Sequence, residues 1–486
     1  MLNKGFIIWL FFVVIVTLPS FTVVFSDAYN YDYWGQPRPT KKGYEVEQTY
    51  FGESLDLTLP DDNQPMHVRH ITDFFVTDDY FYIVDRRQAR VARFDHELNT
   101  VHVIRGITPP DELHQGEELF LEPRGIFISE DGDIYITDYQ REAIYIFDAD
   151  FVFQRKIERP DNPAYGDRPF AVDKIALDRT NRIYVTVGNV YDGIVELTNQ
   201  GEFSRFFGVQ EVSVNPIDIV WRRFMTQAQL DNTVLFLPVE YTNLTIDPSG
   251  FIFATATSES RTPIQRLNPN GNDVLRRNGY VPPAGDASRR SGGLTPNQFV
   301  SVTVNDFGMY SVLDRASRRI FTYNEQGYLV FVTGGEGDGI GQFRTPSTIA
   351  YQNERLWVGD TTLNTLTVFQ LTSFGEQVKQ AHQRSFLGDY DGIGALWDAI
   401  IEDDPNFFYA YVGRADQLFR QRRFEEAMEA YQKGFDHRGY SKAYAQLRRE
   451  RLRDNFSLIG LSFSALVVFT IVRPILKDIR RGEDDV

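Results

Sequence analysis

The most constraining feature of the sequence is a segment that recurs with variations. One copy covers residues 116–138 and another covers residues 337–360. Each copy contains a glycine-bearing loop, an aromatic residue, a proline, a short apolar strand, a turn, and a second strand that ends in aspartate. Repeats of this size that contain strands and no helix indicate stacked supersecondary units. The pattern therefore predicts the blades of a β-propeller.

Six such units can be traced along the chain, and tight turns separate their strands. Glycines within these turns, such as Gly132 and Gly250, supply the positive φ that short hairpins require. A long insertion over residues 208–240 separates the third unit from the fourth. We therefore predict a mainly β fold, with a single closed six-bladed ring over residues 44–375. The strand after Tyr44 should complete the last blade, which removes exposed sheet edges.

The motifs resemble those of the NHL-repeat family of β-propellers. The resemblance is clearest at residues 337–346, where a glycine-rich loop leads to Gln342-Phe343 and then to Pro346. An apolar strand, a turn and a strand ending in Asp follow, as in that family. The resemblance covers roughly residues 60–375 and implies a six-bladed propeller. It also implies a binding role, because family members mostly bind proteins, nucleic acids or carbohydrates, whereas a minority of related propellers are metal-dependent lactonases or lyases.

An aspartate recurs at the end of the second strand in four units. These residues could ring the channel and hold a cation, or each could close its own turn. An Asp at a strand end readily accepts hydrogen bonds from nearby backbone N–H groups. Because the residue recurs at equivalent positions, we predict a structural role. The four residues are Asp85, Asp138, Asp314 and Asp360.

The composition and the motifs disfavour or exclude several kinds of partner and functional site. The net charge is −17 and the body of the chain has no long basic run, which disfavours a nucleic-acid partner. There is no cysteine, so thiolate metal sites, thiol catalysis and disulfides are excluded. His67 and His70 lack a third ligand, and the glycines of 334–341 lack the Lys-Ser/Thr of a phosphate loop. We predict no catalytic residue, no cofactor and no metal site. The absence of cysteine also hints at a bacterial source.

An apolar segment at the start of the chain indicates export. Lys4 precedes residues 5–25, which carry no charge, and the small residues Ser26 and Ala28 follow. This arrangement is typical of a signal peptide, and the run is also long enough to remain as an uncleaved signal anchor. We assign residues 1–28 to one of these two alternatives.

A second apolar segment lies near the end of the chain. Residues 456–472 are uncharged, and the long side chain of Arg473 can extend the span, so we predict a transmembrane helix over 456–476. Basic residues flank this segment on both sides, and charge alone does not orient it. The export signal places the preceding body outside the cytoplasm. Residues 477–486 then form a cytoplasmic tail.

Between the propeller and this segment the apolar period changes from two to about 3.6. Ala415 and Ala427 occupy the small-residue positions of two helices within residues 405–438, which resemble a single tetratricopeptide unit. The family's terminal proline is absent. We predict a TPR-like helical segment over residues 385–454. A lone repeat rarely forms a groove, so we expect it to pack as a stalk between propeller and membrane.

These observations predict a membrane-anchored extracytoplasmic binding or scaffold protein. Its propeller would present a loop face to a protein or carbohydrate partner, and association with a transporter complex is one such role. The alternative is a metal-dependent lactonase- or lyase-like propeller enzyme. Binding residues are expected where loops enter the innermost strands and in the insertion between the third and fourth units. These candidates are Glu122, Arg124, Arg168, Asn243, Arg344 and Trp221.

Overall fold

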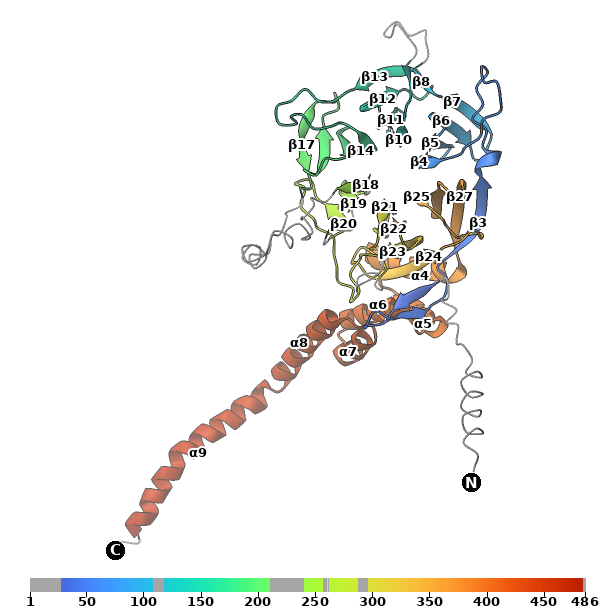
Figure 1. Cartoon of the computed structure of the whole chain (residues 1–486). Helices are drawn as coiled ribbons and strands as arrows, with labels where there is room; N and C mark the ends of the chain where they lie inside the picture. The colour runs from blue at the N-terminus through green and yellow to red at the C-terminus, as the bar shows by residue number, and fades with distance from the viewer. Residues whose placement is uncertain are drawn as a thin grey trace, which may run out of the picture.

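In a computed structural model, the chain forms a six-bladed ring with a helical segment at one side (Figure 1). The structure describes residues 28–107, 118–209, 240–256, 260, 262–286 and 296–483. Residues 1–27 of the signal segment predicted over 1–28 lie outside these ranges, and so does Trp221.

Each blade is an antiparallel sheet. In blades one to five the strands follow in chain order from the channel outward, and in blade six the outermost strand comes from the start of the ring. The first three blades contain four strands each. Blade one holds β4 (Ile71–Val76), β5 (Tyr80–Asp85), β6 (Arg90–Asp95) and β7 (Thr100–Ile104); blade two holds β10 (Pro123–Ile128), β11 (Ile134–Asp138), β12 (Ala143–Phe147) and β13 (Phe153–Ile157); blade three holds β14 (Val172–Leu177), β15 (Ile183–Val187), β16 (Ile194–Leu197) and β17 (Phe203–Phe207).

The remaining blades close the ring. Blade four holds β18 (Tyr241–Ile246), β19 (Ile252–Ala256) and β20 (Ile264–Leu267); blade five holds β21 (Phe299–Val304), β22 (Tyr310–Asp314), β23 (Arg319–Tyr323) and β24 (Leu329–Gly334); blade six holds β25 (Pro346–Gln352), β26 (Arg355–Asp360), β27 (Thr365–Leu371) and β3 (Tyr44–Phe51). Strand β3 pairs antiparallel with β27, from Tyr44↔Leu371 to Phe51↔Thr365. The predicted closure, in which the first strand completes the last blade, is confirmed.

Turn glycines and strand-end aspartates behave as the sequence predicts. Gly132 and Gly250 have φ of 90° and 81°, a region that a side chain disfavours. Asp138 is completely buried, and its carboxylate accepts hydrogen bonds from the N–H groups of Leu121 (2.7 Å) and Glu122 (3.1 Å). Asp85, Asp314 and Asp360 likewise accept N–H bonds from the loop that enters their blade. The aspartates therefore tie the entry loops to the blades.

The core consists of six apolar clusters, one between each pair of neighbouring blades. Large side chains such as Phe81, Tyr145 and Tyr310 are fully buried within them. Because every blade packs on two neighbours, the apolar burial that stabilises the ring is distributed around it. Most of the many aromatic residues therefore serve the core.

Two short pairs and six helices complete the described chain. The pairs are β1 (Tyr29–Tyr31) with β2 (Pro37–Pro39) and β8 (Gly106–Ile107) with β9 (Glu118–Leu119), and the 3₁₀ turn η1 spans Gly52–Ser54. The helices are α4 (Ser373–Leu387), α5 (Ile393–Asp403), α6 (Phe408–Arg420), α7 (Phe424–Lys433), α8 (His437–Asp454) and α9 (Phe456–Glu483).

Helix α4 joins the helical segment to the propeller, and the sequence analysis did not anticipate it. Phe374 and Val378 of α4 are buried in the same cluster as Phe331 of blade five and Trp397 of α5. The buried His382 contacts the backbone carbonyl of Phe307 through Nε2 at 3.0 Å. The helices are therefore packed directly on the ring.

The N-terminal segment strengthens this attachment. The Lys41 N–H donates to the Asp404 carboxylate at 2.8 Å, and the Asn406 amide donates to the Pro39 carbonyl at 3.1 Å. Tyr31 is buried among residues of blades four and five. Residues 28–43 therefore contact both the propeller and the helices.

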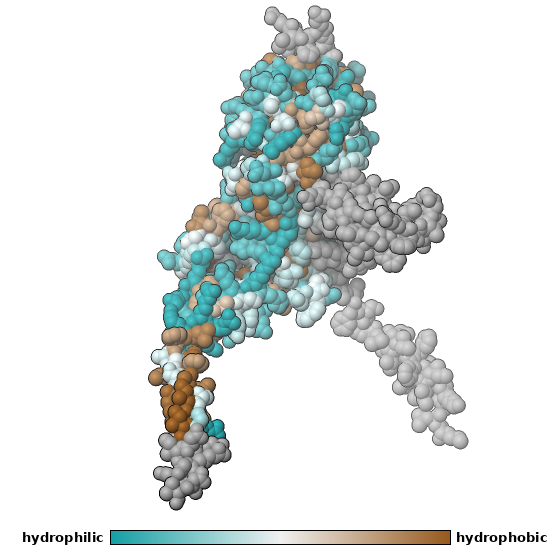
Figure 2. All heavy atoms as spheres, turned by 90° about the vertical axis from the view of Figure 1, so that its left-hand side faces the viewer, coloured by the Kyte–Doolittle hydropathy of each residue, from teal (hydrophilic) through white to brown (hydrophobic). Residues whose placement is uncertain are grey.

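One helix in the described part of the chain is long and apolar enough to span a membrane. Phe456–Ile475 has a mean hydropathy of 2.0, and none of it is buried. It follows α8 almost without a break, since the Asn455 N–H donates to the Arg451 carbonyl at 3.1 Å and the Ile459 N–H donates to the Asn455 carbonyl at 2.9 Å. Figure 2 shows this apolar helix projecting beyond the hydrophilic surface of the rest of the molecule.

Candidate functional site: the mouth of the central channel

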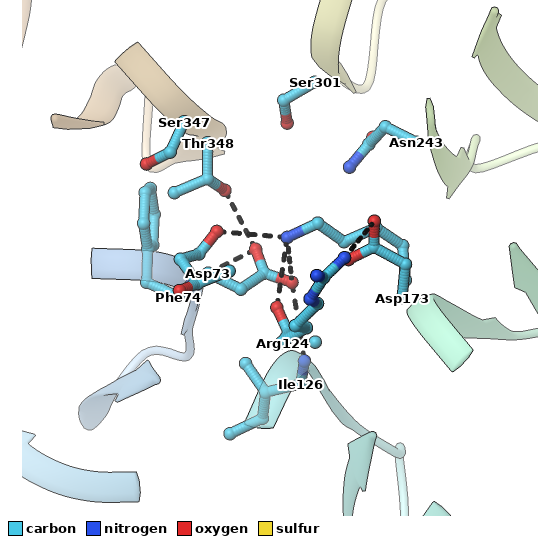
Figure 3. Close-up of polar contacts among 12 residues, drawn as sticks. Asp73, Phe74, Arg124, Ile126, Asp173, Asn243, Ser301, Ser347 and Thr348 are labelled. Atoms are coloured by element: carbon cyan, nitrogen blue, oxygen red, sulfur yellow. Dashed lines mark hydrogen bonds and ion pairs between the residues drawn. The ribbon is translucent and has the colours of Figure 1, made fainter. Parts of the chain in front are cut away.

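The innermost strands carry an irregularity at the same place in every blade. Each shifts register just after its first paired residue, for example between Pro123 and Gly125 of β10 and between Pro346 and Thr348 of β25. A β-bulge of this kind redirects side chains and often lies beside functional sites. The side chains at these bulges point toward the centre of the ring (Figure 3).

The third residue of each innermost strand lies at this irregularity, and together these residues form an inner ring. The six positions are Asp73, Gly125, Lys174, Asn243, Ser301 and Thr348. Several of them bond to the next blade: the Asn243 Oδ1 accepts from the Val302 N–H at 3.2 Å, and the Ser301 hydroxyl accepts from the Ile349 N–H at 3.2 Å. Part of the inner ring therefore seals the joints between blades.

An ion pair crosses the centre of the ring. The Lys174 ammonium of blade three lies 3.0 Å from the Asp73 carboxylate of blade one, and both side chains are nearly buried. Lys174 also donates to the Thr72 carbonyl at 3.1 Å and the Arg124 carbonyl at 3.3 Å. Blade two has glycine at this position and packs closely on blade three, since a Cβ on Gly125 would lie 2.5 Å from the Asp173 carbonyl and 3.3 Å from the Lys174 Cα.

Charged residues gather just outside this pair, at the channel mouth. The Arg124 guanidinium donates to Glu122 at 2.7 Å, lies 3.6 Å from Asp173, and stacks on Tyr139 at 3.5 Å from the ring centroid. Arg86 reaches the same Glu122 carboxylate from blade one at 2.6 Å. These contacts link three blades at the mouth.

Burial and charge act together on the titrating groups of the mouth. Burial raises the pKa of Asp173 even though Lys174 and Arg124 favour its ionised form. Burial and the nearby cations, with Arg86 first among them, lower the pKa of His70. A third of the Asp173 side chain is exposed, because it faces the solvent within the channel while protein surrounds it. The mouth is thus a confined site with cations on several sides.

The structure brings together only some of the residues that the sequence singled out. Glu122 and Arg124 are in contact at the mouth, and Asn243 lies buried in the inner ring. Arg168, in the loop that enters blade three, instead pairs at 2.7 Å with Asp192 of the β15–β16 turn, and Arg344 pairs with Asp338 of its own entry loop. The predicted role of these residues in binding stays a prediction.

Sequence reasoning missed two arginines and the central lysine. Arg86 and Arg315 each follow a strand-end aspartate, Asp85 and Asp314, and this shared position could have identified them. Their backbone N–H groups donate to the equivalent carbonyls of His70 (3.2 Å) and Gln298 (2.9 Å), which places both at the mouth. No signal marked Lys174, because its partner Asp73 belongs to another repeat.

The described residues contain no group of three or more His, Cys, Asp or Glu side chains that could hold a metal ion. At the centre of the ring the Lys174 ammonium takes the place next to the Asp73 carboxylate and two backbone carbonyls. These oxygens are of the type that Ca²⁺ prefers, but here they already contact a fixed cation.

No protein-family model matches the sequence, and no curated protein sequence matches it. The solved structures that resemble it include a virginiamycin B lyase from Staphylococcus aureus, with 13% identity, a TM-score of 0.39 and coverage of 68% of this chain and 94% of that chain. Another is described as a gluconolactonase, with 11% identity, a TM-score of 0.40 and coverage of 68% and 98%.

A third is the extracellular domain of a protein described as a one-component system from B. thetaiotaomicron, with 12% identity, a TM-score of 0.38 and coverage of 68% of this chain and 35% of that chain. Similarity at these levels supports no argument about ligand or activity. The NHL-repeat and tetratricopeptide resemblances rest on the sequence motifs alone.

Proposed function

We propose that the protein is a membrane-anchored extracytoplasmic binding protein whose propeller presents its channel mouth and entry loops to a protein partner. One observation carries this proposal. The apolar, unburied span Phe456–Ile475 continues from a helical segment that is itself packed on the ring. A ring fixed to a membrane helix is suited to capturing a partner close to the membrane surface.

The mouth supports a binding role through its concentration of charge. Arg86, Arg124 and Glu122 form a linked group on rigid strands, and prolines such as Pro123 restrict the backbone beside them. Side chains held in this way lose little entropy when a ligand binds. A transporter complex in the same membrane is one partner that this proposal includes.

The enzymatic alternative has less support. A lactonase- or lyase-like propeller would need ligands for a divalent cation that converge on the channel. In this chain Lys174 neutralises the central carboxylate, and metal binding there would require the displacement of a buried ammonium. We therefore favour binding over metal-dependent turnover.

Site-specific photo-crosslinking in native membranes tests the proposal. A photo-reactive amino acid would replace Leu121, which is 46% exposed in a loop at the mouth. The matched control replaces Val152, which is 55% exposed in the turn between β12 and β13, on the opposite face of the ring.

We expect a discrete crosslinked protein from position 121 and none from position 152. Crosslinking from position 152 alone would show that the partner binds the face opposite the mouth, contrary to the proposal. The absence of any crosslink at several mouth positions would contradict the binding function itself.

A further inference from the structure

One guanidinium at the channel mouth has no carboxylate partner within the described residues. Arg315 follows the buried Asp314 at the end of β22, and its Nε donates to the Pro346 carbonyl at 3.4 Å, near the limit of a hydrogen bond. Arg86 and Arg124, by contrast, both contact Glu122 at 2.6–2.7 Å. Among the residues that the structure describes, no carboxylate occupies the terminal amino groups of Arg315.

Protein atoms and a carboxylate of another blade act on the charge of Arg315. Burial lowers its pKa, and its charge interacts with the Asp173 carboxylate of blade three. Arg315 is nonetheless exposed to solvent, so an anion from a partner can reach its guanidinium.

Cations outnumber carboxylates among the described residues named here. Three guanidinium groups, on Arg86, Arg124 and Arg315, lie near two carboxylates, on Glu122 and Asp173, and Arg87 adds a further positive charge near His70. Asp360 lies nearby, but its oxygens accept backbone N–H bonds from Arg344, Thr345 and the following turn. The described part of the mouth therefore favours an added anion.

We propose that the mouth binds one carboxylate of an acidic segment in a protein partner, with Arg315 as its anchor. The planar fork of a guanidinium matches a carboxylate through two parallel hydrogen bonds. This inference rests on the proposed binding function and names the chemistry that the site recognises.

Other ligands fit the mouth less well. The Asp173 and Glu122 carboxylates would repel a phosphate dianion more strongly than a singly charged carboxylate. A sugar would need an open aromatic face for stacking, but Arg124 already covers the ring of Tyr139 at 3.5 Å. The acidic side chain of a protein is therefore the occupant that the observations favour.

Titration calorimetry on the full-length protein in a neutral detergent tests the proposal. The probes are an acetylated hexaglutamate peptide, a hexaglutamine peptide and inorganic phosphate. The test variant is Arg315→Gln. The control is Arg179→Gln, because the Arg179 guanidinium also donates to a proline carbonyl of the next blade, Pro248 at 3.0 Å, but from the β14–β15 turn on the opposite face.

We expect hexaglutamate to bind the wild-type protein and the Arg179→Gln variant equally, and Arg315→Gln to weaken it at least tenfold. Hexaglutamine should not bind, and phosphate should bind at least tenfold more weakly than hexaglutamate. Equal hexaglutamate binding by the two variants, or tighter binding of phosphate, would overturn the proposal.

The crosslinking experiment separates the two levels of inference. If the crosslink from position 121 forms equally well in the Arg315→Gln background, the carboxylate proposal is wrong and the binding function stands. If wild-type protein gives no crosslink while hexaglutamate binds through Arg315, the anion site stands and the proposed protein partner is wrong.

Discussion

Replacement of Lys174 by methionine should destabilise the propeller by a predictable amount. The change removes the ammonium but preserves an unbranched side chain of similar length. It leaves the Asp73 carboxylate, which is only 12% exposed, without its cation. Removal of one member of a buried ion pair typically costs about 3–5 kcal/mol.

The structure places the effect at the lower end of that range. Asp73 keeps three hydrogen-bond donors: the Thr348 hydroxyl at 2.9 Å, the Phe74 N–H at 3.1 Å and the Ile126 N–H at 3.4 Å. We therefore expect a loss of about 3 kcal/mol in the free energy of unfolding. With an unfolding entropy of about 2.1 cal/mol/K per residue over roughly 330 residues, this lowers Tm by about 4 °C.

The assay is thermal unfolding of the detergent-solubilised protein, followed by tryptophan fluorescence. Lys433→Met in α7 is the control, because Lys433 is exposed and should change Tm by less than about 1 °C. The double variant Asp73→Asn/Lys174→Met removes both charges and should recover part of the loss, since no isolated charge then remains buried. A Tm for Lys174→Met within 1 °C of wild type, or strictly additive single variants, would refute the reasoning.

Three further outcomes are expected. Asp138→Ala should lower the free energy of unfolding by about 2–4 kcal/mol, whereas Asp138→Asn should cost less, because the buried carboxylate accepts three backbone N–H bonds; denaturant titration of both variants checks this. Hydrogen bonds from Arg90 lower the pKa of Asp62 to about 2, so this group contributes stability above pH 4, about 1–2 kcal/mol, that is lost as the pH falls toward 2. Tm measured from pH 5 to pH 2 should therefore fall more steeply for wild type than for Asp62→Asn, and parallel curves would exclude the contribution. Phe374→Ala should cost about 3–5 kcal/mol and release the helices from the ring, which limited proteolysis would detect as earlier cleavage near α4.

The fold could be predicted because its determinants are local and repeated. A glycine such as Gly132 marks a hairpin wherever it follows an apolar strand, and an aspartate such as Asp138 marks the loop that it closes. Six repetitions of the same local signals leave few alternatives to a ring. The closure through Tyr44 followed from the cost of exposed sheet edges.

The site could be predicted only in part because it depends on contacts between repeats. Glu122 and Arg124 are two residues apart, and their pairing is local. Lys174 and Asp73 are about a hundred residues apart in the sequence, and their contact depends on the close approach of blades two and three, which Gly125 permits. Arg168 and Arg344 precede innermost strands as the sequence predicts, but Asp192 of the β15–β16 turn pairs with Arg168, and Asp338 of the same entry loop pairs with Arg344.

Helix α4, which packs on blades five and six, could likewise not be predicted from the sequence. Its pattern is mixed, and its burial depends on Phe331 and Tyr44, which belong to blades five and six. A helix whose apolar face is defined by a distant sheet gives little periodic signal of its own.

The central claim is that the ring lies outside the cytoplasm and that α9 crosses the membrane. The absence of cysteine from the chain permits a direct measurement, since each introduced thiol is unique. One variant carries Val152→Cys in the exposed β12–β13 turn, and another carries a cysteine appended after Val486. A membrane-impermeant maleimide on intact cells should label the first variant at once and the second only after permeabilisation. Labelling of the appended cysteine in intact cells, or protection of position 152, would contradict the account.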